Sequence, residues 1–221
     1  MNKVRAVIFD VYQTLLAVAP GPENAADGWV ESWREYFGIA PSLSLAEFDQ
    51  ACRGVVARDH ARQKKEGIPW PEVDWRRVTE RAAGALSGLS QEQLDLFLSR
   101  HAALQRRTRG MPGAGDFLTK IRRQGLLTGI ASNAQSYTFG EMAAAGIPVG
   151  GFARDLCFWS FEQGFSKPDP AVFAWLTARL GARGISPEET LMIGDRMDND
   201  IAPARAAGWR TWHFQGSWPE L

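Results

Sequence analysis

Hydrophobic residues near the start of the chain are concentrated at Val4 and from Ala6 to Phe9, and several of them are β-branched. A short run of this kind is typical of a strand that is buried on both faces of a parallel sheet. Similar runs recur at 126–131, 156–159, 190–193 and 209–214, with helical patterns between them. Strands that alternate with helices predict an α/β fold with a doubly wound, parallel, Rossmann-like sheet.

The middle of the chain has a helical pattern instead. Trp29 and Trp33 belong to an apolar stripe with helical spacing. Ser44 and Ser90 are each followed three residues later by Glu or Gln, which is the signature of a capping box at the start of a helix. Before these helices, residues 17–27 contain two prolines and a glycine and predict a linker.

These patterns divide the chain into a core and an insert. We assign residues 1–16 and 110–221 to the core with the sheet, and residues 17–109 to a helical insert after the first strand. Residues 110–115 contain three glycines and a proline where the chain returns to the core. We predict no strand directly before them, so we interpret this segment as a turn and not as a dinucleotide-binding loop.

The composition excludes several classes of partner. The 221 residues include 25 Lys and Arg against 25 Asp and Glu, so no basic excess favours a nucleic-acid partner. Cys52 and Cys157 lack metal-ligand spacing, and we interpret them as reduced thiols of a cytoplasmic protein. The start shows no apolar leader, and no run of about 18 apolar residues predicts a membrane span. We expect a cytoplasmic monomer or homodimer that acts on a small molecule.

Polar residues that can carry chemistry follow the predicted strands. They are Asp10, Ser132, Lys167 and Asp195. Each alone has an ordinary structural interpretation, as a helix cap, a turn residue or a solvated charge. In a parallel sheet, however, the carboxyl ends of the strands share one edge, where ligands bind. We therefore expect these residues, although they are distant in sequence, to meet in one site.

The segment from Asp195 to Asp200 is strongly acidic, with Asp198 between its ends. Several carboxylates beside Asp10 would repel one another unless a cation lay among them. Oxygen ligands at a phosphate-binding edge favour Mg²⁺, which binds through one or two carboxylates together with substrate oxygens. We interpret Asp198 as a solvated residue at the start of a helix, where acidic side chains are favoured.

Four segments, in order along the chain, resemble the motifs of the haloacid dehalogenase (HAD) superfamily. They are Phe9-Asp10-Val11-Tyr12-Gln13-Thr14-Leu15, Ile130-Ala131-Ser132-Asn133, Lys167-Pro168-Asp169-Pro170, and Ile193-Gly194-Asp195 with Asp200. The resemblance covers the whole chain, and the helical insert is similar to the cap that closes over the site in this superfamily. It implies an α/β fold with an HAD-like core and an inserted α-helical cap domain.

The resemblance also implies roles for these residues. Asp10 would be a nucleophile that forms a covalent ester or acyl phosphate, which water later hydrolyses. Ser132 and Lys167 would be catalytic groups that also bind the substrate, together with Thr14 and Asn133. The implied Mg²⁺ ligands are Asp10, the backbone carbonyl of Tyr12, Asp195 and Asp200.

The sequence departs from the phosphatase pattern at Tyr12. Phosphatases of this kind usually have Asp there, as the general acid and base, and such catalysis contributes about 10² to 10⁴ in rate. A phenol can donate a proton, so Tyr12 is a candidate for that role, but it is a poor base at neutral pH.

Three interpretations therefore remain open. The first is a Mg²⁺-dependent phosphatase that acts on a small phosphomonoester. The second is a 2-haloacid dehalogenase with the same nucleophile, because a halide leaves without a proton, although the acidic segment would repel a carboxylate substrate. The third is a phosphate-binding or regulatory protein that has lost turnover. We interpret the basic segment 105–109 as a solvated face and the tryptophans of the insert as packing residues.

Overall fold

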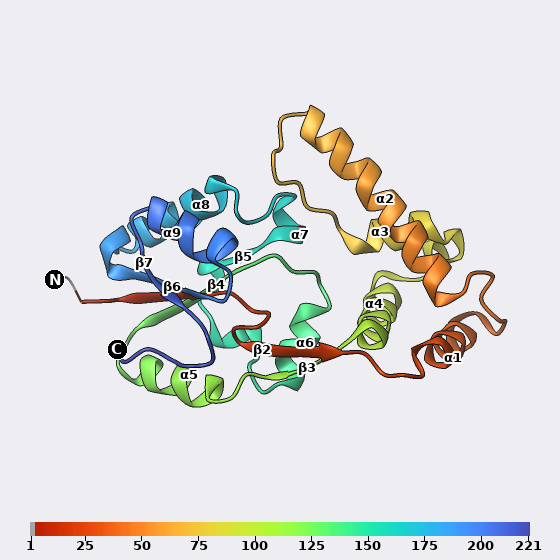
Figure 1. Ribbon diagram of the computed structural model, residues 1–221, viewed down its shortest axis with the longest axis horizontal. Coiled ribbons are helices and arrows are strands. Elements are labelled where there is room, and N and C mark those ends of the chain that lie inside the picture. The colour runs from red at the N-terminus through yellow and green to blue at the C-terminus, as the bar shows by residue number, and fades with distance from the viewer. Residues whose placement is uncertain (1–2) are drawn as a thin grey trace.

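A five-stranded parallel sheet lies at the centre of the larger part of the molecule, as Figure 1 shows for the computed structural model, which describes residues 3–221. The strand order is β5-β4-β1-β6-β7. The strands are β1 (Ala6–Phe9), β4 (Leu127–Ser132), β5 (Cys157–Trp159), β6 (Thr190–Gly194) and β7 (Arg210–His213). Because β1 pairs with β4 on one side and β6 on the other, its carboxyl end lies in the middle of the sheet edge. The predicted doubly wound sheet is confirmed.

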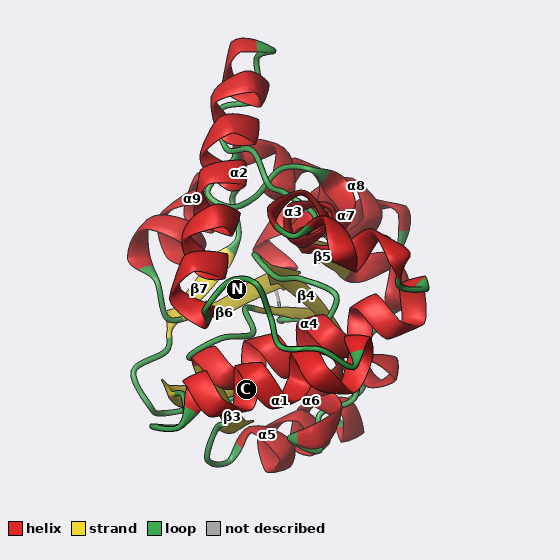
Figure 2. Ribbon diagram, turned by 90° about the vertical axis from the view of Figure 1, so that its right-hand side faces the viewer, coloured by secondary structure: helices red, strands yellow, loops and turns green. Residues whose placement is uncertain are grey.

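Helices cover both faces of this sheet (Figure 2). Val7 and Phe9 of β1 pack in the cluster that contains residues of α5 (Ala114–Arg123) and α6 (Thr138–Ala144). Ala6 and Ile8 point to the other face, toward α8 (Pro170–Ala182) and α9 (Ala202–Ala206). Alternate residues of a strand face opposite sides, and burying each large apolar side chain contributes about 1.5 to 3 kcal/mol. The unbroken apolar run of β1 is thus explained by burial on both faces.

Two elements that follow strands are not α-helices of ordinary length. A four-residue helix, α7 (Ser160–Gln163), follows β5 directly. After β6, the chain forms a π-helical turn, Met197–Ile201, before the short helix α9. The π-helical turn carries Asp200 on the side of the strand end, which places this residue within the site described below.

The insert contains α1 (Ala25–Phe37), α2 (Leu45–Lys65), α3 (Trp75–Ala82) and α4 (Gln91–Gln105). These helices enclose a separate apolar cluster in which Trp29 stacks on Phe48 and contacts Phe97. The capping boxes predicted at Ser44 and Ser90 are both present. Within the described part of the chain, we find no helix with the length and apolar character that a bilayer span requires.

An antiparallel ribbon of two strands joins the insert to the core. Strand β2 (Leu16–Pro20) pairs with β3 (Arg106–Gly110), and Figure 1 shows the two side by side between the sheet and the helices of the insert. The linker predicted at residues 17–27 is therefore wrong for residues 17–20, which pair with a distant strand, and for residues 25–27, which begin α1. Pro20 ends β2, which fits a residue without a donor for further pairing. The predicted domain limits at residues 17 and 109 both fall within this ribbon.

The insert also docks on the core through the segment before α3. The backbone amide of Ser166 donates to the carbonyl of Trp70 at 2.9 Å, and that of Glu72 donates to the carbonyl of Gly164 at 3.0 Å. The amide side chain of Gln135 donates to the carbonyl of Val73 at 2.9 Å. These contacts place the insert over the carboxyl ends of β4 and β5.

Candidate active site

Asp10 and Asp195 lie at adjacent strand ends in the middle of the sheet. Asp10 follows β1, Asp195 follows β6, and Phe9 and Ile193 are paired in the parallel ladder between the two strands. The backbone amide of Asp10 donates to the carbonyl of Ile193 at 2.9 Å, which continues this ladder past the last paired residue. The two carboxylates are therefore held by the backbone of the central strands.

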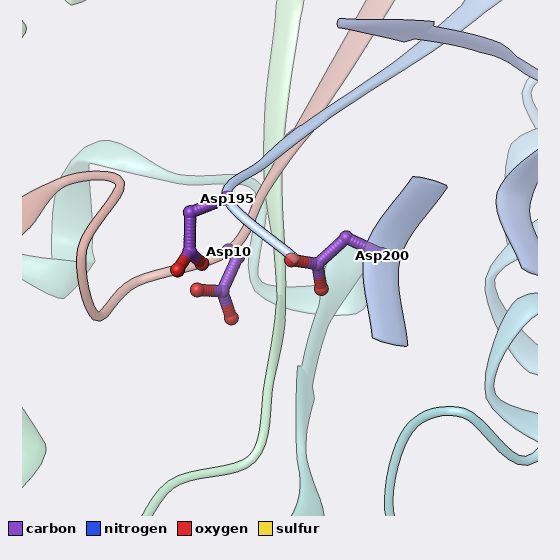
Figure 3. A group of neighbouring side chains, drawn as sticks. All are labelled: Asp10, Asp195 and Asp200. Carbon is purple, nitrogen blue, oxygen red and sulfur yellow. The ribbon is translucent and has the colours of Figure 1, made fainter. Parts of the chain in front are cut away.

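Asp200 completes an acidic cluster with these two residues. One carboxylate oxygen from each of Asp10, Asp195 and Asp200 lies within 4.8 Å of the others, and Figure 3 shows the three groups converging. Asp200 is buried and accepts a bond of 3.0 Å from the backbone amide of Arg196. A Cβ atom at Gly194 would collide with the Asp200 side chain, so glycine is required for this approach.

Lys167 lies against the same cluster. Its Nζ atom is 2.7 Å from Oδ1 of Asp10 and 2.5 Å from Oδ1 of Asp200, and the side chain is almost fully buried. Burial alone would lower the pKa of Lys167, but the charges of Asp10 and Asp200 raise it above its ordinary value. Lys167 is therefore held as a cation between two carboxylates.

The acidic cluster carries more negative charge than Lys167 compensates. Burial raises the pKa of Asp10, as does the charge of Asp200, while the Lys167 ammonium lowers it. Burial and the charge of Asp200 also raise the pKa of Asp195. Three carboxylates face one ammonium, and converging hard oxygen donors of this kind fit a divalent cation. The cluster could therefore hold a metal ion.

Asn133 positions the loop that carries Lys167. Its side-chain Nδ2 donates to the carbonyl of Lys167, and its Oδ1 accepts from the backbone amide of Lys167, both at 2.8 Å. Asn133 was predicted to bind substrate. Both ends of its amide contact the Lys167 backbone, so its clearest contribution in the structure is to fix the register of that loop.

The hydroxyl groups of Ser132 and Thr14 are buried, and neither has a hydrogen-bond partner within residues 3–221. Leaving such a group unsatisfied costs about 1 to 3 kcal/mol. Both were predicted to bind substrate, and Ser132 ends β4, next to the strand that leads to Asp10. Neither residue is among those that line the cavity described below, so both substrate-binding roles stay predictions.

The hydroxyl of Tyr12 lies in a polar network beside the site. It is 2.5 Å from Oε2 of Glu141 and 2.7 Å from Oγ1 of Thr138, and the Arg106 guanidinium donates to it at 2.7 Å. Burial raises the pKa of Tyr12 well above its ordinary value. The interpretation of segment 105–109 as a solvated face is wrong for Arg106, which is partly buried and paired with Glu141.

A cavity of about 220 Å³ opens over the acidic cluster. Since a water molecule takes about 30 Å³, this space admits a phosphoryl group. Its lining residues are Asp10, Tyr12, Gln13, Asn133, Lys167, Asp195, Arg196, Asn199 and Asp200. Sequence reasoning missed Gln13, Arg196 and Asn199. Gln13 has a left-handed backbone with φ of 58°, which is uncommon for a residue other than glycine and marks the tight turn after Asp10.

A family model of haloacid dehalogenase-like hydrolases matches residues 4–208, which span both the core and the insert. The chain belongs to this hydrolase family. The resemblance inferred from the four motifs is confirmed, and the HAD fold accounts for the sheet, the inserted helices and the acidic strand ends described above.

Relatives within the family include phosphatases. A phosphoserine phosphatase of Thermus thermophilus is 32% identical over 155 residues, which cover 69% of this chain but only 57% of that enzyme. A ribulose-1,5-bisphosphate 5-phosphatase of Halopiger xanaduensis is 28% identical over 213 residues, or 96% of this chain and 85% of that enzyme.

Solved structures of HAD proteins share the fold. A 2-haloacid dehalogenase from Pseudomonas syringae pv. Tomato superposes with a TM-score of 0.59 at 21% identity, over 94% of this chain and 85% of that one. At this identity the likeness concerns the fold alone.

Proposed function

We propose that this HAD hydrolase is a Mg²⁺-dependent phosphatase that acts on a small phosphomonoester through an aspartyl phosphate on Asp10. The observation that carries the proposal is the contact of the Lys167 ammonium with Asp10 and Asp200, beside the carboxylate of Asp195. This arrangement supplies a nucleophile, a fixed cation and a set of hard oxygen donors around one cavity. The names of the two phosphatase relatives support the same activity.

Asp10 is suited to attack phosphorus. A carboxylate needs no base to become a nucleophile, and covalent capture divides one difficult displacement into two easier ones. Lys167 contacts only Oδ1, so Oδ2 is the oxygen with which Asp10 would attack. The Oδ2–P bond forms as the bond from phosphorus to the leaving oxygen breaks. Water then attacks phosphorus, the Oδ2–P bond breaks, and Asp10 is regenerated.

Lys167 and Ser132 would stabilise the transferring group. In the transition state, negative charge is spread over the phosphoryl oxygens. Hydrogen-bond donors that already point at these oxygens stabilise this charge without having to reorganise. Lys167 is already oriented by two carboxylates, and the unpartnered Ser132 hydroxyl is free to donate. Asp10, Asp195, Asp200 and the Tyr12 carbonyl are the groups that would hold Mg²⁺, which supplies positive charge to offset that on the phosphoryl oxygens.

A direct assay tests this proposal. Phosphate release from a panel of phosphomonoesters is measured with and without Mg²⁺, beside chloride release from 2-chloropropionate. We expect Mg²⁺-dependent phosphate release that Asp10→Asn abolishes, and a phosphoryl group trapped on Asp10 by acid quench. Chloride release alone would establish the dehalogenase instead. Neither product, with retained binding of a phosphate analogue such as vanadate, would favour the non-catalytic alternative.

A further inference from the structure

The Tyr12 hydroxyl has no hydrogen-bonding capacity left for a substrate. A phenol has one proton to donate and two lone pairs that accept. The proton goes to the Glu141 carboxylate, because a carboxylate can only accept. The Arg106 guanidinium can only donate, and the Thr138 hydroxyl therefore supplies the remaining bond. All three positions on the oxygen are filled by protein groups.

Rigid elements hold these partners in place. Arg106 is the first residue of β3, in the ribbon that joins the insert to the core, while Thr138 and Glu141 lie on α6. The guanidinium makes two further bonds of 3.1 Å to Glu141 and lies 4.7 Å from the centre of the Tyr12 ring. It also lies 5.2 Å from the ring centre of Tyr137. Turning Tyr12 toward a leaving group would break its hydrogen bonds with the charged, partly buried side chains of Glu141 and Arg106.

This arrangement bears on the first chemical step, in which the leaving oxygen departs with the electron pair of its bond to phosphorus. An alkoxide is a strong base, comparable to hydroxide, so an alkyl phosphate needs a proton at the leaving oxygen. A carboxylate leaving group, with a conjugate acid of pKa about 4, departs without one. Because the Tyr12 proton is already donated to Glu141, Tyr12 cannot protonate an alkoxide leaving group. Loss of this acid should slow the reaction of an alkyl phosphate but not that of an acyl phosphate.

We infer that the site selects phosphoryl donors whose leaving group departs unprotonated, and that it favours an acyl phosphate, the mixed anhydride of phosphate and a carboxylic acid, over an alkyl phosphomonoester. The inference rests on the proposed phosphatase activity. In the first step the Asp10 Oδ2–P bond forms, the P–O bond of the anhydride breaks, and a carboxylate leaves with the electron pair. In the second, water displaces Asp10, and its protons pass to the phosphate product and to solvent.

The test compares kcat/KM for acetyl phosphate with kcat/KM for glycerol 1-phosphate, with Mg²⁺ present and spontaneous hydrolysis subtracted. In the unchanged protein we expect acetyl phosphate to be favoured by at least about 10²-fold, the lower end of what a positioned acid contributes. Tyr12→Asp restores a carboxyl acid, so it should raise kcat/KM for the alkyl phosphate by about 10² to 10⁴ and narrow the preference.

Tyr137→Asp is the matched control, because it makes the same change at the other ring beside Arg106. It should leave the ratio between the two substrates unchanged. Comparable kcat/KM values for both substrates in the unchanged protein would overturn the inference while leaving the phosphatase proposal in place. An unaltered ratio in a folded Tyr12→Asp variant would also overturn it. No phosphate from either donor would defeat both proposals together.

Discussion

The Nζ atom of Lys167 lies 2.7 Å from Oδ1 of Asp10, although 157 positions separate the two residues in sequence. The fold brings them together because β1 lies in the centre of the sheet and the Lys167 loop is fixed by Asn133 at the end of the neighbouring strand. Asp200 contacts the same ammonium, so a single cation compensates two buried carboxylates. Substitutions at Lys167 and at the acidic residues around it therefore test the charge balance of the site.

Replacing Lys167 with Met should destabilise the metal-free protein more than the Mg²⁺-loaded one. Removing one partner from a buried ion pair leaves uncompensated charge and costs about 3 to 5 kcal/mol. A divalent cation would restore the balance, so Mg²⁺ should stabilise Lys167→Met more than the unchanged protein. Urea unfolding with and without Mg²⁺ measures this difference. Lys120→Met, at an exposed position on α5, is the control. Equal Mg²⁺ stabilisation of all three proteins would show that the cation does not compensate the carboxylates that Lys167 contacts.

The two aspartates Asp195 and Asp198 should respond differently to the same substitution. Asp195 belongs to the converging cluster, whereas Asp198 is exposed and pairs with Arg196. We expect Asp195→Asn to weaken Mg²⁺ binding by at least about tenfold, because a charged ligand is lost. Asp198→Asn, three residues away, should have little effect. Calorimetric titration with Mg²⁺ measures both, and similar affinities for the two variants would argue against Asp195 as a ligand.

The sheet was predictable because its determinants are local. Each buried strand is a short apolar run, and Asp10 and Asp195 directly follow two of them, so their meeting follows from parallel pairing. The β2–β3 ribbon was not predictable in this way, because Ala17 pairs with Arg109, which is distant in sequence. Strand β3, Arg106–Gly110, has no apolar run that would reveal the pairing from sequence.

The polar network around Tyr12 was also not predictable from the sequence. Thr138 and Glu141 lie on a short helix outside the four motifs, and Arg106 lies in a segment that reads as solvated. Only the packing of α6 against β3 brings their side chains to one phenol oxygen. The sequence shows that Tyr12 departs from the phosphatase pattern, but it does not predict which groups bind its hydroxyl.

Ser132→Ala should weaken phosphate binding without weakening the fold. The Ser132 hydroxyl is buried and unpartnered within the described chain, so its removal should leave the free energy of unfolding unchanged or raise it by about 1 kcal/mol. Loss of a donor to a charged group should lower the affinity for inorganic phosphate by about tenfold or more, at about 1.5 to 3 kcal/mol for the bond.

Ser160→Ala is the matched control for this prediction. Ser160 follows β5, beside β4, but its hydroxyl donates to Glu72 at 2.8 Å and accepts from the backbone amide of Ala134 at 3.0 Å. This variant should lose about 1 kcal/mol or more of stability and change phosphate affinity little. If Ser132→Ala instead lost stability and kept phosphate affinity, Ser132 would be a structural residue.

Glu72 should make the stability of the protein depend on pH. Burial raises the pKa of this carboxyl, against the opposing effect of its bonds from the Val73 amide and the Ser160 hydroxyl. Between its ordinary and its raised pKa, the folded protein therefore holds a proton that the unfolded chain has released. The contribution of Glu72 to stability then falls as pH rises through that window, and Glu72→Gln, which cannot ionise, removes this fall.

The measurement is the free energy of unfolding of both proteins from about pH 4 to about pH 7, since subtracting one from the other cancels the remaining carboxyls. The gain in stability from Glu72→Gln should grow with pH and level off once the buried carboxyl is fully ionised. Glu66→Gln, at the exposed end of α2, controls for the substitution itself. A Glu72→Gln difference that stays constant across this range would show that Glu72 carries the same charge when the insert is docked and when the chain is unfolded.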